Sequence, residues 1–413
     1  MAPPPPARKY GHPLFFCTFT DSAEGSQVVL GGGGGASSTG VANRLLLVPV
    51  QPNDAVKGGP HKDQLKSDPA SELHTGDITT VSGTWVQNKP YFVAVLSGGA
   101  GLSKYKLGKG ADGKEEFREV EVDGGKAESF KQAEIKTVAS NASGTRIAVG
   151  YNTGKIVIYD TETMGEIRSF DPEKHEDVLP PKGGIMNLCY SPCGGKILVV
   201  KDSGVAFVWE SGAGAPASPS KKKKKHSKDK KSNSGSAGGG ATVVKFPQDL
   251  GTFRGCYAFQ GGDGKPLFCL GVNCKDRKSR VSTWRIAGGS HAARQVFRYA
   301  HGAAMTALAG HSGEATGNRL VATASSEGDV CVFSAGESSL TALHRVSNAH
   351  MIFVTDLSFS RDGRRLVSVS ADAGARITCV TRSAKQIAMQ RHILLALLPL
   401  LVALIIALVR QLL

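Results

Sequence analysis

The chain has 413 residues, enough for one large all-β domain or two ordinary ones, and its 51 glycines with only 7% aromatic residues favour many short strands joined by turns. The formal net charge is +15, but residues 211–242 hold eight lysines and one aspartate and supply +7 of it, so the remainder is only mildly basic. The sequence has no nucleophile elbow, HExxH or kinase motif, and its eight cysteines include no CxxC pair. These absences argue against a covalent enzyme and a zinc site, and scattered thiols fit a reducing cytosol.

The first feature in chain order is a run of five glycines at 31–35, lying between the apolar segments 28–30 and 45–50. Apolar runs on both sides predict a strand, a shaped glycine loop and a return strand rather than a terminal linker. We place the loop at residues 31–43.

Two nucleotide-binding interpretations of this loop fail on spacing. Gly35 and Gly40 have the separation of a phosphate-binding loop, but Val41 stands where that loop requires lysine. The loosest dinucleotide pattern also matches, yet a β-rich run follows instead of the helix that holds the pyrophosphate. Glycine backbones can turn successive carbonyls toward one point, as in sites for large monovalent cations, while a plain flexible hairpin loop is the alternative.

A repeat becomes visible when the turn glycines are aligned. Each unit reads strand, polar-glycine turn, strand, glycine turn, strand, and Gly154, Gly204, Gly328 and Gly374 mark the second turn. Once the insert at 211–242 is removed, the spacing is 46 to 50 residues, with one hidden unit between Gly204 and Gly328. The seven units are 13–50, 78–107, 137–160, 187–210, 254–286, 318–334 and 356–380.

This period, with four short strands per unit, predicts an all-β fold, a seven-bladed WD-repeat-like β-propeller, in preference to a stacked pair of sandwiches. Degenerate forms of the WD dipeptide end three of the third strands: Tyr159-Asp160, Trp209-Glu210 and Trp284-Arg285. His301 and His350 precede blade starts, as WD-repeat histidines do.

Two insertions interrupt the repeat. Residues 51–76 are polar and contain three prolines, which predicts an ordinary loop extension. Within and beside it lies a small polar cluster, Asp68, Glu72, His74 and Asp77, which we interpret as surface rather than as a metal site. The second insertion, 211–242, has low hydrophobicity and like charges, which predict disorder. It could contact anionic lipid or nucleic acid, or simply be a solvated loop, and its charge centres on Lys221, Lys222, Lys223, Lys224 and Lys225.

The C-terminal end has the composition of a membrane anchor. Residues 393–409 are apolar without a charge, and 393–413 reach the length of about 20 residues that a bilayer requires. We therefore predict a single C-terminal transmembrane helix at 393–413, a juxtamembrane linker at 383–392 and a cytosolic propeller at 1–382. The flanking basic residues are Lys385 and Arg391 before the span and Arg410 after it. This weak bias agrees with the cytosolic assignment.

A seven-unit propeller, a glycine loop ending Gly-Val-x-Asn and a C-terminal span together resemble the Sec-twelve family. Members are endoplasmic-reticulum exchange factors for the small GTPase Sar, which starts COPII vesicle coat assembly. The resemblance covers the whole chain in architecture, and its specific part is GGGGGASSTGVANRL at 31–45.

The resemblance implies that the loop is ordered by a bound potassium ion and docks on the switch regions of the GTPase. The implied potassium-binding residues are Gly31, Gly32, Gly33, Gly34, Gly35 and Asn43. The resemblance does not indicate which of their carbonyls face the ion. The implied GTPase contacts are Gly40, Val41 and Asn43.

The same resemblance implies guanine-nucleotide exchange without covalent chemistry, so the protein is not expected to be an enzyme in that sense. The implied partners are a Sar-type GTPase and the endoplasmic-reticulum membrane, with the propeller facing the cytosol at exit sites. Neither a small-molecule substrate nor nucleic acid is expected. The alternatives are an accessory factor for export to the Golgi without exchange activity, and a nucleic-acid-binding regulator. The lysine-rich insert is not a feature of the family.

Overall fold

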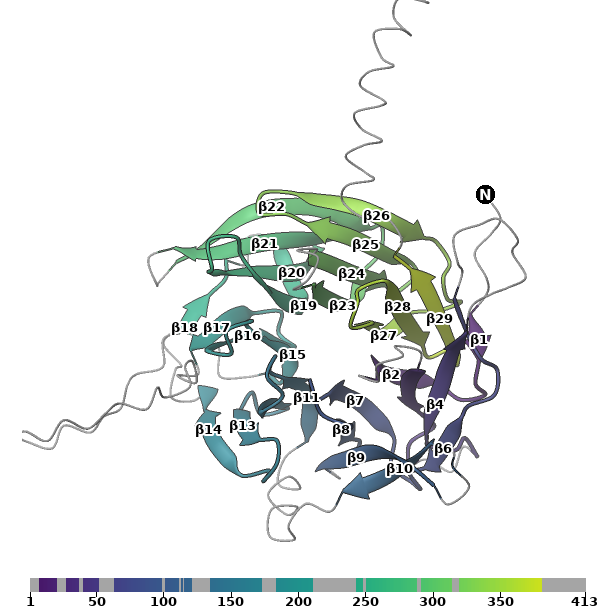
Figure 1. Cartoon of the computed structure of the whole chain (residues 1–413). Coiled ribbons are helices and arrows are strands. Elements are labelled where there is room, and N and C mark those ends of the chain that lie inside the picture. Colours follow the sequence, from purple (N-terminus) through teal and green to yellow (C-terminus); the bar gives the residue numbers. More distant parts are fainter. Residues whose placement is uncertain are drawn as a thin grey trace, which may run out of the picture.

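In a computed structural model the chain forms seven antiparallel sheets arranged as blades around a central axis (Figure 1). The structure describes residues 7–20, 27–36, 40–51, 63–98, 101–110, 113, 115–120, 134–172, 183–210, 243–247, 250–287, 291–313 and 319–380. The predicted all-β, seven-bladed propeller is confirmed.

Each blade contains an inner strand next to the axis, two middle strands and an outer strand. Blade one contains β2 Leu14–Phe19, β3 Gln27–Gly32, β4 Arg44–Gln51, β5 Gln64–Leu65 and β6 Ser71–His74. Blade two contains β7 Thr80–Trp85, β8 Tyr91–Leu96, β9 Gly101–Lys109 and β10 Glu115–Val120. Blade three contains β11 Ile135–Ser140, β12 Arg146–Tyr151, β13 Ile156–Asp160 and β14 Glu166–Phe170. Blade four contains β15 Ile185–Tyr190, β16 Lys196–Lys201, β17 Ala206–Glu210 and β18 Val243–Lys245.

The remaining three blades follow in chain order. Blade five contains β19 Gly251–Gln260, β20 Pro266–Cys274, β21 Ser279–Ala287 and β22 His291–His301. Blade six contains β23 Met305–Ser312, β24 Arg319–Ser325, β25 Val330–Ala335 and β26 Leu340–Val346. Blade seven contains β27 Val354–Phe359, β28 Arg365–Ser370, β29 Gly374–Cys379 and β1 Arg8–Lys9.

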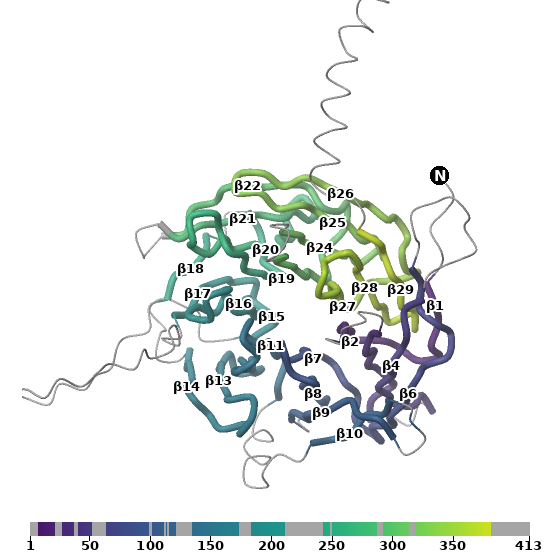
Figure 2. Tube along the Cα trace, viewed as in Figure 1, coloured from purple at the N-terminus to yellow at the C-terminus, as the bar shows by residue number. Residues whose placement is uncertain are grey.

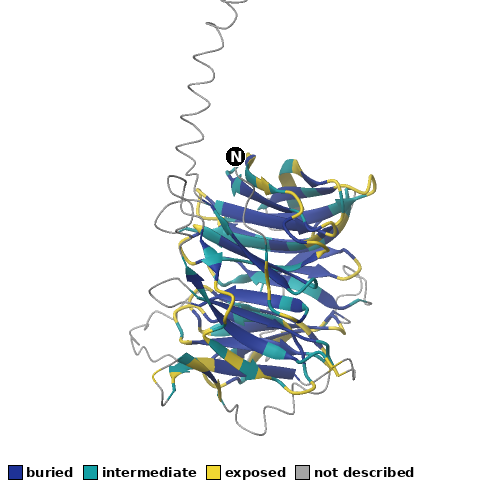
Figure 3. Cartoon of the chain, turned by 90° about the vertical axis from the view of Figure 1, so that its right-hand side faces the viewer, coloured by how far each residue is buried: buried dark blue, intermediate teal, exposed yellow. Residues whose placement is uncertain are grey.

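The hydrophobic core lies between the blades, where the two faces of neighbouring sheets meet (Figure 3). A middle strand is covered on both faces, so it reads as a continuous apolar run: every residue of β8, YFVAVL, is buried. An outer strand is covered less well, and most residues of β14, EIRSF, are exposed or half-buried. Burial therefore falls from the middle of each blade to its rim.

Ring closure depends on the N-terminal segment, because β1 pairs with β29 through Arg8↔Ala375 and Lys9↔Gly374. Figure 2 shows the two ends of the described chain side by side at this point. The predicted blade one begins at residue 13 and does not include this strand, since two residues carry no periodicity.

Blade one corrects another expectation, because part of 51–76 is not a simple loop extension. Both β5 and β6 pair with β4, so the fourth strand of this blade is split in two. Leu65 and Leu73 pack against the apolar clusters on either side of the blade, which explains why these polar segments adopt strands.

The two predicted WD-repeat histidines connect successive blades. His301 Nε2 lies 2.9 Å from Thr323 Oγ1, and His350 Nε2 lies 2.8 Å from Ser368 Oγ. Both rings are buried, and burial lowers the pKa of each histidine to about 4. They are therefore neutral hydrogen-bonding partners that tie the connection before a blade to the second strand of that blade.

Among the described residues, no helix combines the length and apolar character needed to cross a membrane. The predicted linker at 383–392, the predicted span at 393–413 and the lysine-rich insert at 211–242 lie outside the described residues.

Candidate functional site

The glycine tract lies between β3 and β4. It is on the face of the ring at which the inner strand of each blade begins. Gly31 and Gly32 belong to β3 and pair with Leu45 and Arg44, so the loop itself runs from 33 to 43 rather than from 31. Residues 37–39 lie outside the described part of this loop. A Cβ on Gly32 would lie 1.9 Å from the Pro13 carbonyl oxygen, so glycine permits the close approach of the segment that leads into β2.

Gly33 begins the loop in a conformation that suits no other residue. Its N–H donates to the Pro13 carbonyl at 2.9 Å, its φ is +147°, and a Cβ here would lie 2.1 Å from Asn43 Oδ1. Both the backbone angle and the approach of the amide therefore require glycine.

Asn43 holds the base of the loop. Its Oδ1 accepts hydrogen bonds from Gly35 N–H at 2.9 Å and from Thr79 Oγ1–H. Its Nδ2 donates to the Gly35 carbonyl at 3.1 Å and to the Gly76 carbonyl at 2.8 Å, while its own carbonyl accepts from Thr75 N–H at 3.1 Å. One side chain thus joins the loop to residues 75–79, the connection from blade one to blade two.

The resemblance implied that Asn43 contacts a partner and the ion, and the structure gives its side chain a different position. Asn43 is only 3% exposed, because it comes directly before β4 and turns inward against Gly35 and Thr79. Both donors and both lone pairs of the amide are used within the chain. Asn43 therefore acts here as a positioning residue, and its Oδ1 does not fit as an ion ligand.

Backbone carbonyls are the remaining candidates for cation binding in the loop. Among the described residues, no group of three or more His, Cys, Asp or Glu side chains could hold a metal ion. The donor set for potassium would thus consist of carbonyls around Gly33, Gly34 and Gly35, while Gly31 and Gly32 lie within the strand.

The tip of the loop is accessible. Ala36 and Gly40 are exposed, and Val41 is half-buried. Gly40 has a φ of +72°, and a Cβ on it would meet no atom within 4 Å. A buried, hydrogen-bonded base therefore carries a loop that is exposed at Ala36 and Gly40.

The polar cluster predicted to be surface is indeed on the rim of blade one. Asp68 and Asp77 are exposed, and Glu72 and His74 lie on β6. Glu72 Oε1 is 3.0 Å from both Arg44 Nη1 and His74 Nε2, so the carboxylate forms an ion pair with Arg44 and lies beside the His74 ring.

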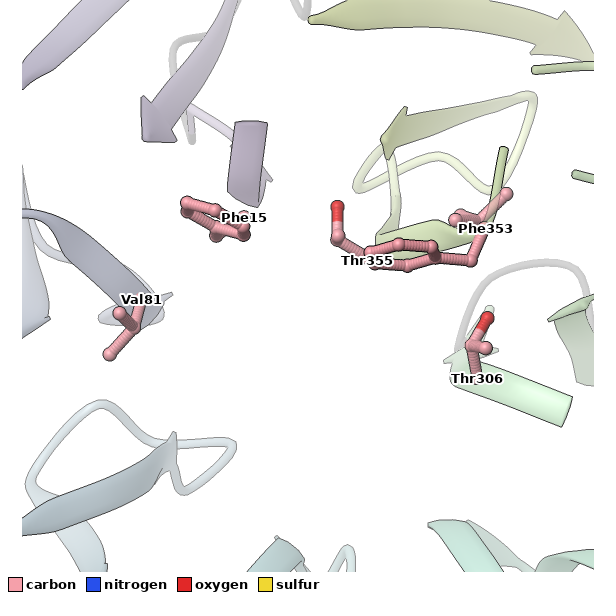
Figure 4. Close-up of a pocket in the computed structure, with 6 residues that line it drawn as sticks. Phe15, Val81, Thr306, Phe353 and Thr355 are labelled. Carbon is pink, nitrogen blue, oxygen red and sulfur yellow. The ribbon is translucent and has the colours of Figure 1, made fainter. Parts of the chain in front are cut away.

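A second feature of the same end of the ring was missed by the sequence analysis. An open pocket of about 340 Å³ at the mouth of the central channel is lined by Phe15, Val81, Thr306, Phe353, Val354 and Thr355. Five of these side chains, from four blades, surround the mouth in Figure 4. Beside it, Met351, Ile352 and Phe353 are 82%, 41% and 43% exposed. The sequence signal was an apolar triplet in the turn-like segment before β27.

The pocket and the glycine loop are connected through the backbone. Pro13, which accepts from Gly33, lies two residues before Phe15, and Thr79, which donates to Asn43, lies two residues before Val81. The two segments that fix the loop therefore lead directly into the pocket wall.

Comparison with known proteins supports the class of fold. The family model "WD domain, G-beta repeat" matches residues 342–378, from β26 into β29. No curated protein matches the chain. In all, 1461 solved chains match, so the fold by itself does not select a function. One is the crystal structure of Sqt1 from Chaetomium thermophilum, similar with a TM-score of 0.56 and 14% identity over 91% of this chain and 84% of that one.

The chain is thus a seven-bladed β-propeller that contains a WD40 repeat, a fold that acts as a scaffold for protein interactions. The likeness to Sqt1 concerns the fold alone.

Proposed function

We propose that this propeller is a guanine-nucleotide exchange factor for a Sar-type small GTPase and starts COPII coat assembly at the endoplasmic reticulum. The observation that carries the proposal is the glycine loop whose base is held by the buried Asn43 amide while its tip is exposed. A loop fixed before binding loses little conformational freedom when a partner docks.

Exchange needs no reacting side chain. If the tip around Gly40 and Val41 binds the nucleotide-free GTPase more tightly than the nucleotide-bound form, linkage requires it to weaken nucleotide binding by the same factor. The role of Asn43 in this proposal is to hold the tip in its binding position through Gly35.

Two further elements belong to the proposal. Residues 393–413 anchor the propeller to the endoplasmic-reticulum membrane at exit sites, with the propeller in the cytosol. A potassium ion held by backbone carbonyls of the loop adds order to the part beyond the Asn43 contacts.

The second candidate is an accessory factor that binds the GTPase without accelerating release. Purified full-length chain in lipid nanodiscs would be mixed, at catalytic concentration, with a Sar-type GTPase loaded with a fluorescent guanine nucleotide. Faster release supports the exchange factor, and binding at an unchanged release rate supports the accessory factor. Absence of both binding and acceleration contradicts the proposed partner.

A nucleic-acid function would depend on the lysine-rich segment. We expect deletion of 211–242 to leave exchange unchanged and to reduce binding to anionic liposomes, because each lysine near such a surface contributes about 1 kcal/mol. A matched variant with serine at the five positions Lys221, Lys222, Lys223, Lys224 and Lys225 separates charge from length. Loss of exchange in either variant would show that the insert belongs to the GTPase site.

A further inference from the structure

We infer that the mouth of the central channel is a second contact site for the GTPase, one that accepts an apolar side chain flanked by a carboxylate. The inference rests on the proposed function and names a surface that the glycine loop does not include.

The mouth has a regular structural origin. In every inner strand the pairing with the second strand shifts near its start, after the first residue in six blades and after the third in blade five, and the skipped residue forms a bulge. The seven bulge residues, in blade order, are Phe15, Val81, Lys136, Met186, Arg254, Thr306 and Thr355. Four of these seven line the pocket, so the bulges direct side chains toward the channel mouth.

The ring of bulge residues is chemically asymmetric. Phe15 and Val81, with Phe353 beside them, make the side formed by blades seven, one and two apolar. The exposed side chains of Met351 and Ile352 extend this apolar side outward. A contiguous exposed apolar surface next to a pocket is typical of an interaction site.

The bulge residues of blades three to five include two basic side chains, Lys136 and Arg254. Lys136 Nζ is 2.8 Å from Glu134 Oε1 and is therefore neutralised locally. The contact recorded for Arg254 is Nη1 to Met186 Sδ at 3.7 Å, and a thioether is a weak acceptor. A carboxylate on the ligand would give this guanidinium a stronger partner.

The position of the mouth identifies the occupant. Phe15 and Val81 follow Pro13 and Thr79 by two residues, which in an extended strand is about 7 Å. A globular partner resting on the glycine loop would therefore also cover the apolar side of the mouth. The chain's own lysine-rich segment, 221–225, is a poor occupant because it would face Arg254.

The test measures exchange by full-length chain in nanodiscs as a function of propeller concentration. For Phe353→Ala and Met351→Ser we expect the half-maximal propeller concentration to rise roughly tenfold, because each variant loses one apolar contact with the partner. The maximal rate should stay unchanged. Arg254→Gln should raise it by up to about fivefold, less so at high salt. The matched control is Ile167→Ala, because Ile167 is 46% exposed, like Phe353, but lies on the outer strand of blade three.

The outcomes separate the two proposals. Wild-type exchange that is unaffected by Met351→Ser and Arg254→Gln overturns the second contact site and leaves the exchange function standing. Wild type without binding or exchange overturns both. If Phe353→Ala fails to fold, Met351→Ser decides the matter, because a side chain that is 82% exposed contributes little to folding.

Discussion

The connection between the two middle strands of a blade differs between blade one and blades four and six. Short turns, 202–205 and 326–329, join the middle strands of blades four and six, whereas the segment 33–43 joins those of blade one. In the short turns the backbone makes hydrogen bonds from Gly204 N–H to Lys201 at 2.9 Å and from Gly328 N–H to Ser325 at 3.2 Å, and the carboxylates of Asp202 and Asp329 accept from Gly184 N–H and Asn348 N–H.

Each of these connections also rests on the segment that leads into the next blade. Phe253 N–H donates to the Gly204 carbonyl at 3.0 Å, and His350 N–H donates to the Gly328 carbonyl at 3.1 Å. In blade one, Asn43 makes this contact twice, because its carbonyl accepts from Thr75 N–H at 3.1 Å and its side chain donates to the Gly76 carbonyl at 2.8 Å. The long loop thus adds to its backbone bonds the four hydrogen bonds of one buried amide, whereas each short turn adds a carboxylate contact, and this difference gives the longer connection a fixed base.

Gly33→Val should have the largest effect, because the new side chain would collide with Asn43 and require an unfavourable φ. We expect loss of exchange while the circular dichroism of the propeller stays unchanged. Gly194→Val is the control, since Gly194 also has a positive φ, of +71°, but lies in open space between β15 and β16. Equal exchange by Gly33→Val and wild type would show that loop shape is irrelevant.

Asn43→Ala removes the contacts that distinguish blade one. Groups of Gly35, Gly76 and the buried Thr79 would lose their partner at about 1 to 3 kcal/mol, so exchange should fall by roughly 5- to 150-fold in a nucleotide-release assay. Thr79→Val removes one of these bonds, and we expect a smaller decrease. If Thr79→Val matched wild type while Asn43→Ala lost activity, direct contact between Asn43 and the partner would be favoured over positioning.

Acid should weaken the His350 connection between blades six and seven and not the Asn43 connection of blade one, because Asn43 does not titrate. Burial lowers the pKa of His350 from 6.5 to about 4, so between pH 7.5 and 5.5 the unfolded chain binds a proton that the folded chain does not. The stability from this histidine is fully present above pH 6.5 and falls by about 1.4 kcal/mol at pH 5.5. The difference in free energy of unfolding between wild type and His350→Gln, measured by denaturant unfolding, should therefore decrease by that amount between pH 7.5 and 5.5.

Wild type must be compared with His350→Gln because Asp356 changes the stability of the folded chain in the opposite direction on acidification. Burial raises the pKa of this carboxyl to about 7, so protonation on acidification stabilises the folded chain. This contribution is common to wild type and His350→Gln and cancels in the difference. A difference that does not change with pH would show that the His350 ring is accessible to protons in the folded state.

Replacing potassium by lithium should have the smallest effect. Asn43 already fixes the loop base, so an ion on the remaining carbonyls would order only the segment beyond it, and lithium is too small for carbonyls spaced for potassium. We expect slower exchange in lithium, with a smaller decrease than for Asn43→Ala, and a choline buffer of equal ionic strength as control. Identical rates in all three buffers would remove potassium from the proposal.

The propeller could be predicted from the sequence because its repeat is carried by turn glycines and apolar middle strands. Gly154, Gly204 and Gly328 adopt the positive φ that the predicted turns require. Of the four predicted turn glycines, the exception is Gly374, which begins β29, while Ala373, at a φ of 64°, takes the turn position. The strand β1 escaped prediction because its pairing depends on a partner more than 360 residues away in sequence.

The site was predicted only in part, for a physical reason. Glycine positions reveal where a backbone must be unusual, so the loop was located, but they do not show which way a neighbouring side chain turns. Asn43 could be recognised as important but not as buried, since its inward orientation is set by Thr79 and Gly76 on another segment. The channel mouth was missed because its residues are brought together by ring closure and share no sequence pattern.

The pairing of β1 with β29 also determines when the molecule can be completed during synthesis. Blades one to six need only residues already made, but blade seven needs Arg8 and Lys9 to meet Ala375 and Gly374, a contact of very high sequence separation. Such contacts are slow to form because the loop-closure entropy precedes any gain in contact energy. Until β28 and β29 leave the ribosome, the apolar residues of β2, β3 and β4 lack the blade-seven side chains that bury them, and an exposed apolar edge of this kind favours aggregation.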